Sequence, residues 1–272
     1  MHYLREPKTS KDKISIGNND LYLELENKHE FRYFMDKFDV DAAIADIFVK
    51  VGDKVLDAGA NIGFCSLHYL KNGASKVEAY EPQSHLHKRL VSLEDKRLKV
   101  HKIALSDEVG NATLYISKSH NQGHTINKEI CKIHPRIFGK KITSEAVEVS
   151  TLDTLYARGE EFDFIKLDVE GVELKVIKGG TNLFRCSKNG ILQIEIKDEF
   201  LDEYLEVLNT MYTHIYRVLY SKSDCSLYIT KNFDAPARKG YLIYPPNYLC
   251  SNKALMVPKT LLTDMIVPQW LR

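Results

Sequence analysis

Two glycines and two acids at the ends of two successive predicted strands have the spacing of a cofactor site. The stretch DAGANIGF (57–64) follows the short run KVL (54–56), which is predicted to form a strand, so Gly59 and Gly63 lie in the turn after it. Glu81 ends the next predicted strand, 24 residues after Asp57. A carboxylate there can accept hydrogen bonds from the ribose hydroxyls of an adenosine. We therefore expect a nucleoside ligand at the carboxyl ends of these strands, the alternative being that Glu81 is a surface acid.

The spacing of the glycines separates the cofactors that such a turn can bind. A P-loop requires G-x-x-x-x-G-K-[ST], and no lysine follows Gly63. A dinucleotide loop requires a middle glycine, and Asn61 occupies that place, so a nicotinamide enzyme is the less favoured alternative. Asp57 would repel a phosphate but suits a cationic cofactor such as S-adenosylmethionine, directly or through water. Asp57 could instead brace the loop by accepting local N–H groups.

A second group of acids follows the predicted strand 162–168, in KLDVEGVE. Transfer of a methyl group to an alcohol needs an aligned acceptor and benefits from a base that removes its proton. Asp168 and Glu170 are the candidates for this work, although Glu170 could instead cap the next helix. Glu195, at the end of another strand, and His124 are weaker candidates. Asp168 and Glu170 could also hold a metal, but no third acid has a telling spacing, so we expect none.

Lys166 precedes Asp168 on the same strand face. A buried ion-pair partner of the carboxylate and a role in the reaction are equally good interpretations of this lysine.

Hydrophobic periodicity supplies the elements that position these residues. A hairpin is predicted over 13–25 around Gly17-Asn18-Asn19-Asp20, and a helix over 39–50 with Asp39 or Asp41 as its N-cap. Strands and helices then alternate, which indicates a mainly parallel α/β sheet. The strands are 54–58, 76–81, 98–105, 162–168 and 190–196, and the helices are 63–73, 83–95, 171–184 and 198–211.

Two further segments depart from this alternation. The strands 213–221 and 225–232 are joined by few residues, so they must pair antiparallel, at the end of the sheet. Residues 117–146 interrupt the rhythm and are interpreted as an insertion over the site.

Composition limits the class of protein. The 272 residues have 44% apolar content, 38 Lys and Arg and 37 Asp and Glu, which is typical of a globular protein and argues against a general nucleic-acid binder. No run of 18 apolar residues exists, so no membrane span is expected, and the first residues lack a secretory signal. The five cysteines form no C-x-x-C pair, which favours reduced thiols and a cytoplasmic location.

An ordered set of motifs resembles one family. The segments VLDAGANIGFCSL, AYEP, IALSDEVGNATLY, VSTLDTL, FDFIKLDVEGVELKVIKGG and ILQIEI follow one another over about residues 40–200, as in FkbM-type S-adenosylmethionine-dependent methyltransferases, with a weaker echo at 247–255. The resemblance implies a Rossmann-like class I methyltransferase fold: a mainly parallel seven-stranded sheet with an antiparallel final strand and helices on both faces. It implies S-adenosylmethionine as cofactor and O-methylation of a small molecule or sugar, as in polysaccharide biosynthesis.

The same resemblance implies which residues contact each part of the cofactor. Gly59, Ala60, Asn61 and Gly63 would line the methionine side, Glu81 the ribose, and the backbone around Ala104 the adenine. The chain would comprise an N-terminal lead-in (1–50), a methyltransferase domain (51–230) and a C-terminal extension (231–272) packed on it.

The acceptor is the least defined partner. Segments 117–146 and 231–272 each have six Lys and Arg and two acids, which favours an anionic saccharide or other small molecule, although both could be solvated loops. No motif of base methyltransferases follows the fourth strand, so a nucleic-acid acceptor is not expected. A non-catalytic scaffold of the same fold and an N-methyltransferase are the alternatives, and the oligomeric state is not predicted.

Overall fold

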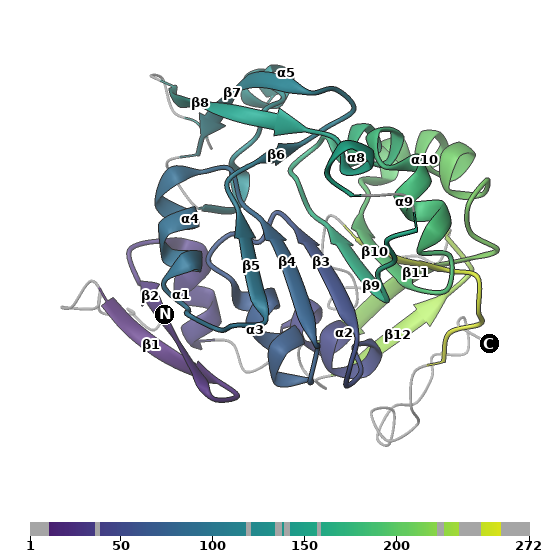
Figure 1. The fold of residues 1–272 in the computed structure, drawn as a ribbon, viewed down its shortest axis with the longest axis horizontal. Coiled ribbons are helices and arrows are strands. Elements are labelled where there is room, and N and C mark those ends of the chain that lie inside the picture. Colours follow the sequence, from purple (N-terminus) through teal and green to yellow (C-terminus); the bar gives the residue numbers. More distant parts are fainter. Residues whose placement is uncertain are drawn as a thin grey trace, which may run out of the picture.

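A computed structural model describes residues 11–35, 39–117, 121–133, 138, 142–156, 159–221, 226–233 and 246–256. Its main sheet has eight strands in the order β12-β11-β13-β10-β9-β3-β4-β5 (Figure 1). In chain order these strands are β3 (Lys54–Ala58), β4 (Lys76–Tyr80), β5 (Leu98–His101), β9 (Phe164–Leu167), β10 (Ile191–Glu195), β11 (His214–Ser221), β12 (Ser226–Thr230) and β13 (Asn247–Ser251).

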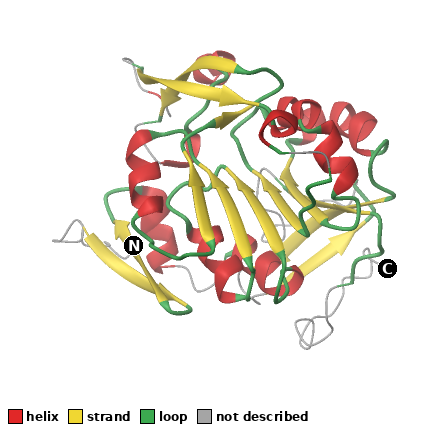
Figure 2. Ribbon diagram, viewed as in Figure 1, coloured by secondary structure: helices red, strands yellow, loops and turns green. Residues whose placement is uncertain are grey.

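Helices cover both faces of this sheet (Figure 2). The described helices are α1 (Lys28–Met35), α2 (Val40–Phe48), α3 (Phe64–Lys71), α4 (Ser84–Val91), α5 (Lys128–Ile133), α7 (Leu152–Leu155), α8 (Glu173–Gly179), α9 (Thr181–Cys186) and α10 (Leu201–Leu208), with 3₁₀ turns η1 (Asn121–Gly123) and η2 (Asp198–Phe200). None of the helices in the described part of the chain is long and apolar enough to cross a membrane.

Strands β5, β4, β3, β9 and β10 are all parallel. Strand β13 is antiparallel to both β10 and β11, and β12 is antiparallel to β11. The described sheet therefore has eight strands where the sequence predicted seven. One strand accounts for the difference: β13 comes from the predicted C-terminal extension to lie between β10 and β11, whereas β11 and β12 are the predicted antiparallel pair.

Alternation along the strands divides the core into two layers. Val55 and Phe164 pack in the cluster that includes α2 and α3, whereas Leu56 and Ile165 pack in the cluster that includes α8 and α10. Because both faces of β3 and β9 are covered, these strands are mainly apolar after the exposed Lys54, and their buried polar residues, Asp57 and Lys166, lie next to the carboxyl ends.

The predicted strand 98–105 is two strands. β5 pairs with β4 in the main sheet, and β6 (Ala104–Leu105) turns away to pair with β8 (Thr143–Ser150). β8 also pairs with β7 (Gly110–Ile116), so a separate three-stranded sheet stands above the carboxyl ends of the main strands (Figure 1). The predicted insertion 117–146 begins where β7 ends and runs into β8, and its described part includes η1 and α5.

The N-terminal residues form a hairpin and two helices. Strands β1 (Lys11–Ile16) and β2 (Asn19–Glu24) pair with Ile16 opposite Asn19, so Gly17 and Asn18 make the turn. Gly17 has φ 60°, which glycine adopts at little cost. Asp39 is the N-cap of α2: its Oδ1 accepts from the backbone N of Asp41 and of Ala42 at 2.9 and 3.0 Å. Asp41 is therefore free of the capping role that the sequence left open.

Candidate active site

One cavity of about 810 Å³ opens at the carboxyl ends of β3, β4 and β9. Its walls come from the loop after β3, the ends of β4 and β9, the start of β6, helix α1 and the described part of the insertion. Eight of the residues predicted for the site lie in this wall: Gly59, Ala60, Asn61, Glu81, Ala104, His124, Asp168 and Glu170. Asp57, Gly63 and Glu195 do not line it.

The loop after β3 lies directly against the end of β9. Gly59 has φ 86°, and a Cβ at this position would lie 1.8 Å from the carbonyl oxygen of Asp168. Its N–H and that of Ala60 both donate to the carbonyl of Tyr80, at 3.0 Å. Asn61 has φ 53°, a left-handed conformation that asparagine tolerates better than most residues. The glycine is thus required by a backbone-to-backbone contact that shapes the cavity.

Glu81 is a buried carboxylate held by two backbone N–H groups. Its Oε2 accepts from Asn61 N at 3.0 Å and its Oε1 from Gln83 N at 2.8 Å. Burial raises the pKa of Glu81 to about 7, although both N–H donors act to lower it. Each oxygen keeps a second acceptor site, so the fixed carboxylate can still accept from ligand hydroxyls.

Asp57 and Gly63 lie behind the loop. Asp57 is fully buried and accepts from the Ser66 hydroxyl at 2.5 Å, and burial raises its pKa. Within the described residues Asp57 accepts this hydroxyl and no local N–H group, so the contact differs from the loop-bracing alternative considered in the sequence. Gly63 begins α3 with φ 90°, where a Cβ would lie 2.5 Å from Leu93 Cδ1. The absence of a side chain at Gly63 thus allows close packing against this leucine.

Asp168 is paired with a buried lysine. The Nζ of Lys166 lies 2.6 Å from Asp168 Oδ2 and 4.0 Å from Asp41 Oδ2. Burial would lower the pKa of Lys166, but the two carboxylates raise it well above its ordinary value. Burial raises the pKa of Asp41 to about 7, with Lys166 acting against the rise. Asp41 also accepts from Gln193 Nε2 at 2.6 Å.

Glu170 and Glu173 have different roles in the turn after β9. Glu173 Oε1 accepts from the backbone N of Val169 and of Gly171, both at 3.0 Å, so Glu173 stabilises this turn. Glu170 lines the cavity in a left-handed conformation, φ 56°. Burial raises the pKa of Glu170 well above its ordinary value, and neighbouring Asp168 adds to the rise. The N-cap position of α8 is Val172, and Glu173 is the first residue of the helix, so neither acid is its N-cap.

The two weaker candidates are placed differently. His124 lines the cavity, and its Nδ1 accepts from the backbone N of Ser117 at 3.0 Å. Glu195 is half-buried at the end of β10, outside the cavity wall. Burial raises the pKa of Glu195 well above its ordinary value, with Asp168 and Asp41 adding to the rise.

Several cavity residues were not predicted from the sequence. Tyr33 of α1 stacks on Phe64, with ring centroids 3.9 Å apart and planes at 10°, and its hydroxyl accepts from Gln122 Nε2 at 3.0 Å. Asn121, Gln122 and Tyr33 bring helix α1 and η1 over the loop after β3. No local pattern marks these residues, because only tertiary packing carries α1 and η1 to the cavity.

These residues fit S-adenosylmethionine in three respects. Gly59 presents backbone without a side chain to the cavity, along which the methionine part can lie. The Glu81 carboxylate, held by backbone N–H groups, suits the ribose hydroxyls. The apolar surroundings of the buried Ala104 suit a planar base. The amide Oδ1 of Asn61 is buried and accepts no hydrogen bond within the described residues. The described residues contain no group of three or more His, Cys, Asp or Glu arranged to hold a metal.

Comparison with known proteins identifies a family. A family model described as the methyltransferase FkbM domain matches residues 57–219, more than half of the 272-residue chain. No curated protein matches the sequence.

Three solved structures illustrate the range of similar folds. A TehB-like SAM-dependent methyltransferase from Corynebacterium glutamicum has 12% identity over 83% of this chain and 95% of its own, with a TM-score of 0.44. A SAM-dependent O-methyltransferase from Thermotoga maritima has 14% identity over 87% and 75%, with a TM-score of 0.41. A putative rRNA methylase from Clostridium thermocellum has 14% identity over 77% and 90%, with a TM-score of 0.41.

Proposed function

The chain belongs to the FkbM methyltransferase family and uses S-adenosylmethionine, and from that premise we propose that it methylates a hydroxyl group of a sugar, a glycan precursor or another small metabolite. The observation that carries the proposal is that one cavity joins the loop Gly59–Asn61 and Glu81 to two acids, Asp168 and Glu170. A non-catalytic scaffold that binds the cofactor would need the loop and Glu81, but it would not need Asp168 and Glu170.

In this proposal the cofactor is held by the strand ends on one side of the cavity. Glu81 accepts the ribose hydroxyls, the backbone of Gly59 to Asn61 passes along the methionine part, and Ala104 contacts the adenine. S-adenosylmethionine, when bound, supplies a methyl group on a positively charged sulfur. Holding the acceptor in line with such a group can contribute about 7–11 kcal/mol of the barrier.

The two acids divide the remaining work. Asp168 is oriented by Lys166, whose Nζ lies 2.6 Å from its Oδ2. It binds and orients either the cationic part of the cofactor or the acceptor. Glu170 has a raised pKa and accepts the proton of the acceptor hydroxyl. A carboxylate with a raised pKa is a stronger base, and a positioned base contributes about 10²–10⁴-fold to such a step.

The charge of the cavity favours a second candidate, N-methylation of an amine. The charged side chains of its described wall, His124 aside, are four acids and one lysine: Asp41, Glu81, Asp168, Glu170 and Lys166. When these carboxyls are ionised, such a wall attracts a cationic amine and suits a neutral polyol, whereas it repels an anion. Of the basic residues in the predicted insertion, Lys128 and Lys132 are exposed, and the others lie outside the described residues. We therefore propose a neutral or cationic acceptor over an anionic one.

A panel of acceptors tests the proposal. Purified protein, S-adenosylmethionine and neutral sugars, sugar phosphates, uronic acids or amines are incubated, and release of S-adenosylhomocysteine is measured. We expect turnover with a neutral hydroxyl compound, lost in Glu170→Gln while cofactor affinity is retained. Binding of the cofactor with no turnover on any member of the panel would favour the scaffold, and turnover on amines alone would favour N-methylation.

A further inference from the structure

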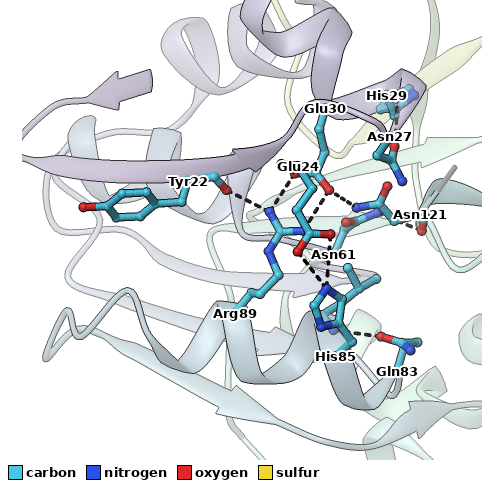
Figure 3. Close-up of polar contacts among 11 residues, drawn as sticks. Tyr22, Glu24, Asn27, His29, Glu30, Asn61, Gln83, His85, Arg89 and Asn121 are labelled. Carbon is cyan, nitrogen blue, oxygen red and sulfur yellow. Dashed lines mark hydrogen bonds and ion pairs between the residues drawn. The ribbon is translucent and has the colours of Figure 1, made fainter. Parts of the chain in front are cut away.

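The buried carboxylate of Glu30 joins three segments beside the cofactor loop (Figure 3). Glu30 lies in α1 and is 1% exposed. Its Oε2 accepts from the backbone N of Glu24 at 2.7 Å, and Arg89 of α4 donates to both carboxylate oxygens, at 2.8 and 2.6 Å. Asn121 of η1 donates its Nδ2 to Oε1 at 2.5 Å. Because Arg89 neutralises the carboxylate, Glu30 can be buried and can still accept from Asn121.

Glu30 fixes which way the amide of Asn121 points. An ionised carboxylate only accepts hydrogen bonds, so the NH₂ group of Asn121 must face Glu30 and its Oδ1 must face away. Asn121 lines the cavity and is 8% exposed. Its Oδ1 is buried and has no hydrogen-bond partner among the residues that the structure describes. An acceptor held in this way at a cavity wall is suited to a ligand donor.

Asn61, which contacts Glu81 at the predicted ribose site, also has its amide NH₂ paired and its amide oxygen unpartnered within the described residues. Its Nδ2 donates to the backbone carbonyl of Asn121 at 3.0 Å, which again leaves the Oδ1 as the unpartnered atom within the described chain. Its backbone N donates to Glu81. Glu30, Asn121, Asn61 and Glu81 therefore form a continuous chain of contacts from α1 to the loop after β3 (Figure 3 draws it as far as Asn61).

We propose that Asn121 is a cofactor-binding residue whose Oδ1 accepts from a donor of S-adenosylmethionine, either the ammonium group or a ribose hydroxyl, and that Glu30 is its positioning residue. The inference rests on the proposed placement of the cofactor in this cavity. Glu30 lies outside the family match at 57–219, so this contribution comes from the chain's own N-terminal helix.

The test measures S-adenosylmethionine affinity by calorimetry in Asn121→Ala, Glu30→Gln and the double variant. We expect each single variant to bind at least tenfold more weakly. The double variant should bind no more weakly than Asn121→Ala, because Glu30 acts through Asn121. Glu24→Gln is the matched control: its carboxylate lies 3.5 Å from the same Arg89 and contacts His85, not Asn121, and its affinity should stay within twofold.

Adenosine, as a second probe, identifies the donor. Equal weakening of adenosine and S-adenosylmethionine by Asn121→Ala points to a ribose hydroxyl, and weakening of S-adenosylmethionine alone points to the ammonium group. Unchanged affinity in Asn121→Ala, or losses that add in the double variant, would overturn the inference. Glu81→Ala separates this failure from a wrong placement of the cofactor: full affinity in Glu81→Ala would remove the placement itself, and the inference with it.

Discussion

The carbonyl oxygen of Asp168 occupies the space that a side chain at position 59 would need. A Cβ built on Gly59 lies 1.8 Å from that oxygen, and the glycine has φ 86°. The loop that begins the cofactor site and the strand end that carries the candidate acids are thus in backbone contact. Their spacing cannot change unless β3 and β9, which are paired in register, also separate.

Gly59→Ala should therefore weaken S-adenosylmethionine binding by more than tenfold and lower the melting temperature. The positive φ alone costs about 1–2 kcal/mol for a residue with a side chain. Gly52→Ala is the matched control, because Gly52 has φ 94° but no atom within 4 Å of a Cβ. It should show the conformational cost without the collision, and its cofactor affinity should stay unchanged. Equal effects of the two substitutions on binding would contradict the steric argument.

The raised pKa of Glu81 predicts a pH dependence of cofactor affinity. The pKa is about 7, above the ordinary 4.5, because the carboxyl is buried. As the pH falls through about 7, Glu81 takes up a proton and loses acceptor capacity, so affinity should fall. Calorimetry from pH 8.5 to 5.5 measures this decline. Glu81→Gln should bind more weakly at pH 8 and should lack the inflection near pH 7; an identical inflection in the variant would assign the titration to another group.

Lys166 should contribute to stability mainly by compensating buried carboxylates. Removing one partner of a buried ion pair costs about 3–5 kcal/mol, so Lys166→Met should lower the free energy of unfolding by about that amount at pH 8. Asp41 has a folded pKa of about 7, above its unfolded 3.8, so it becomes protonated in the folded state as the pH falls through about 7 and needs Lys166 less. The deficit of Lys166→Met should therefore be smaller at pH 6 than at pH 8.

Urea denaturation at the two pH values measures this difference. Lys99→Met is the control: Lys99 is 65% exposed and lies 3.8 Å from Glu78, and its removal should change stability by no more than about 0.5 kcal/mol. A deficit of Lys166→Met that is the same at both pH values would show that its charge does not interact with Asp41.

The position of some cavity residues could be predicted from the local order of the sequence. Glu81 and Asp168 follow apolar strands, and in a parallel sheet such positions meet at one edge, so their proximity was predictable from the strand pattern alone. The alternation of side chains along the strand could also have predicted which face of the sheet Asp57 lies on. It shares a strand face with Val55, which packs toward α2 and α3, and there Ser66 donates to it.

Other parts of the site depend on contacts that no short stretch encodes. Asn121 and Tyr33 reach the cavity through packing of η1 and α1, and the Glu30 interaction that fixes Asn121 spans 91 residues of sequence. Strand β13 enters the sheet between β10 and β11 because both offer it antiparallel pairing, and nothing local in 247–251 indicates which neighbours it takes. Lys166 was ambiguous for the same reason, since Asp41 comes from a helix more than a hundred residues earlier.

Glu170 should show opposite effects on stability and turnover. It has φ 56°, a conformation that costs about 1–2 kcal/mol for a residue with a side chain and little for glycine. Glu170→Gly should therefore raise the free energy of unfolding by up to about 1 kcal/mol, less the loss of whatever the side chain contacts. The same substitution removes the proposed base and should lower kcat by about 10²–10⁴-fold.

Glu94→Gly separates the two effects. Glu94 has φ 51° and is exposed in the turn after α4, outside the cavity wall. It should give a similar gain in stability with unchanged kcat. Denaturant unfolding and S-adenosylhomocysteine release, measured on both variants, check the pair. If Glu170→Gly keeps full turnover, Glu170 is not the base, and its strained conformation then needs an explanation from the packing of Gly171 against Ile130.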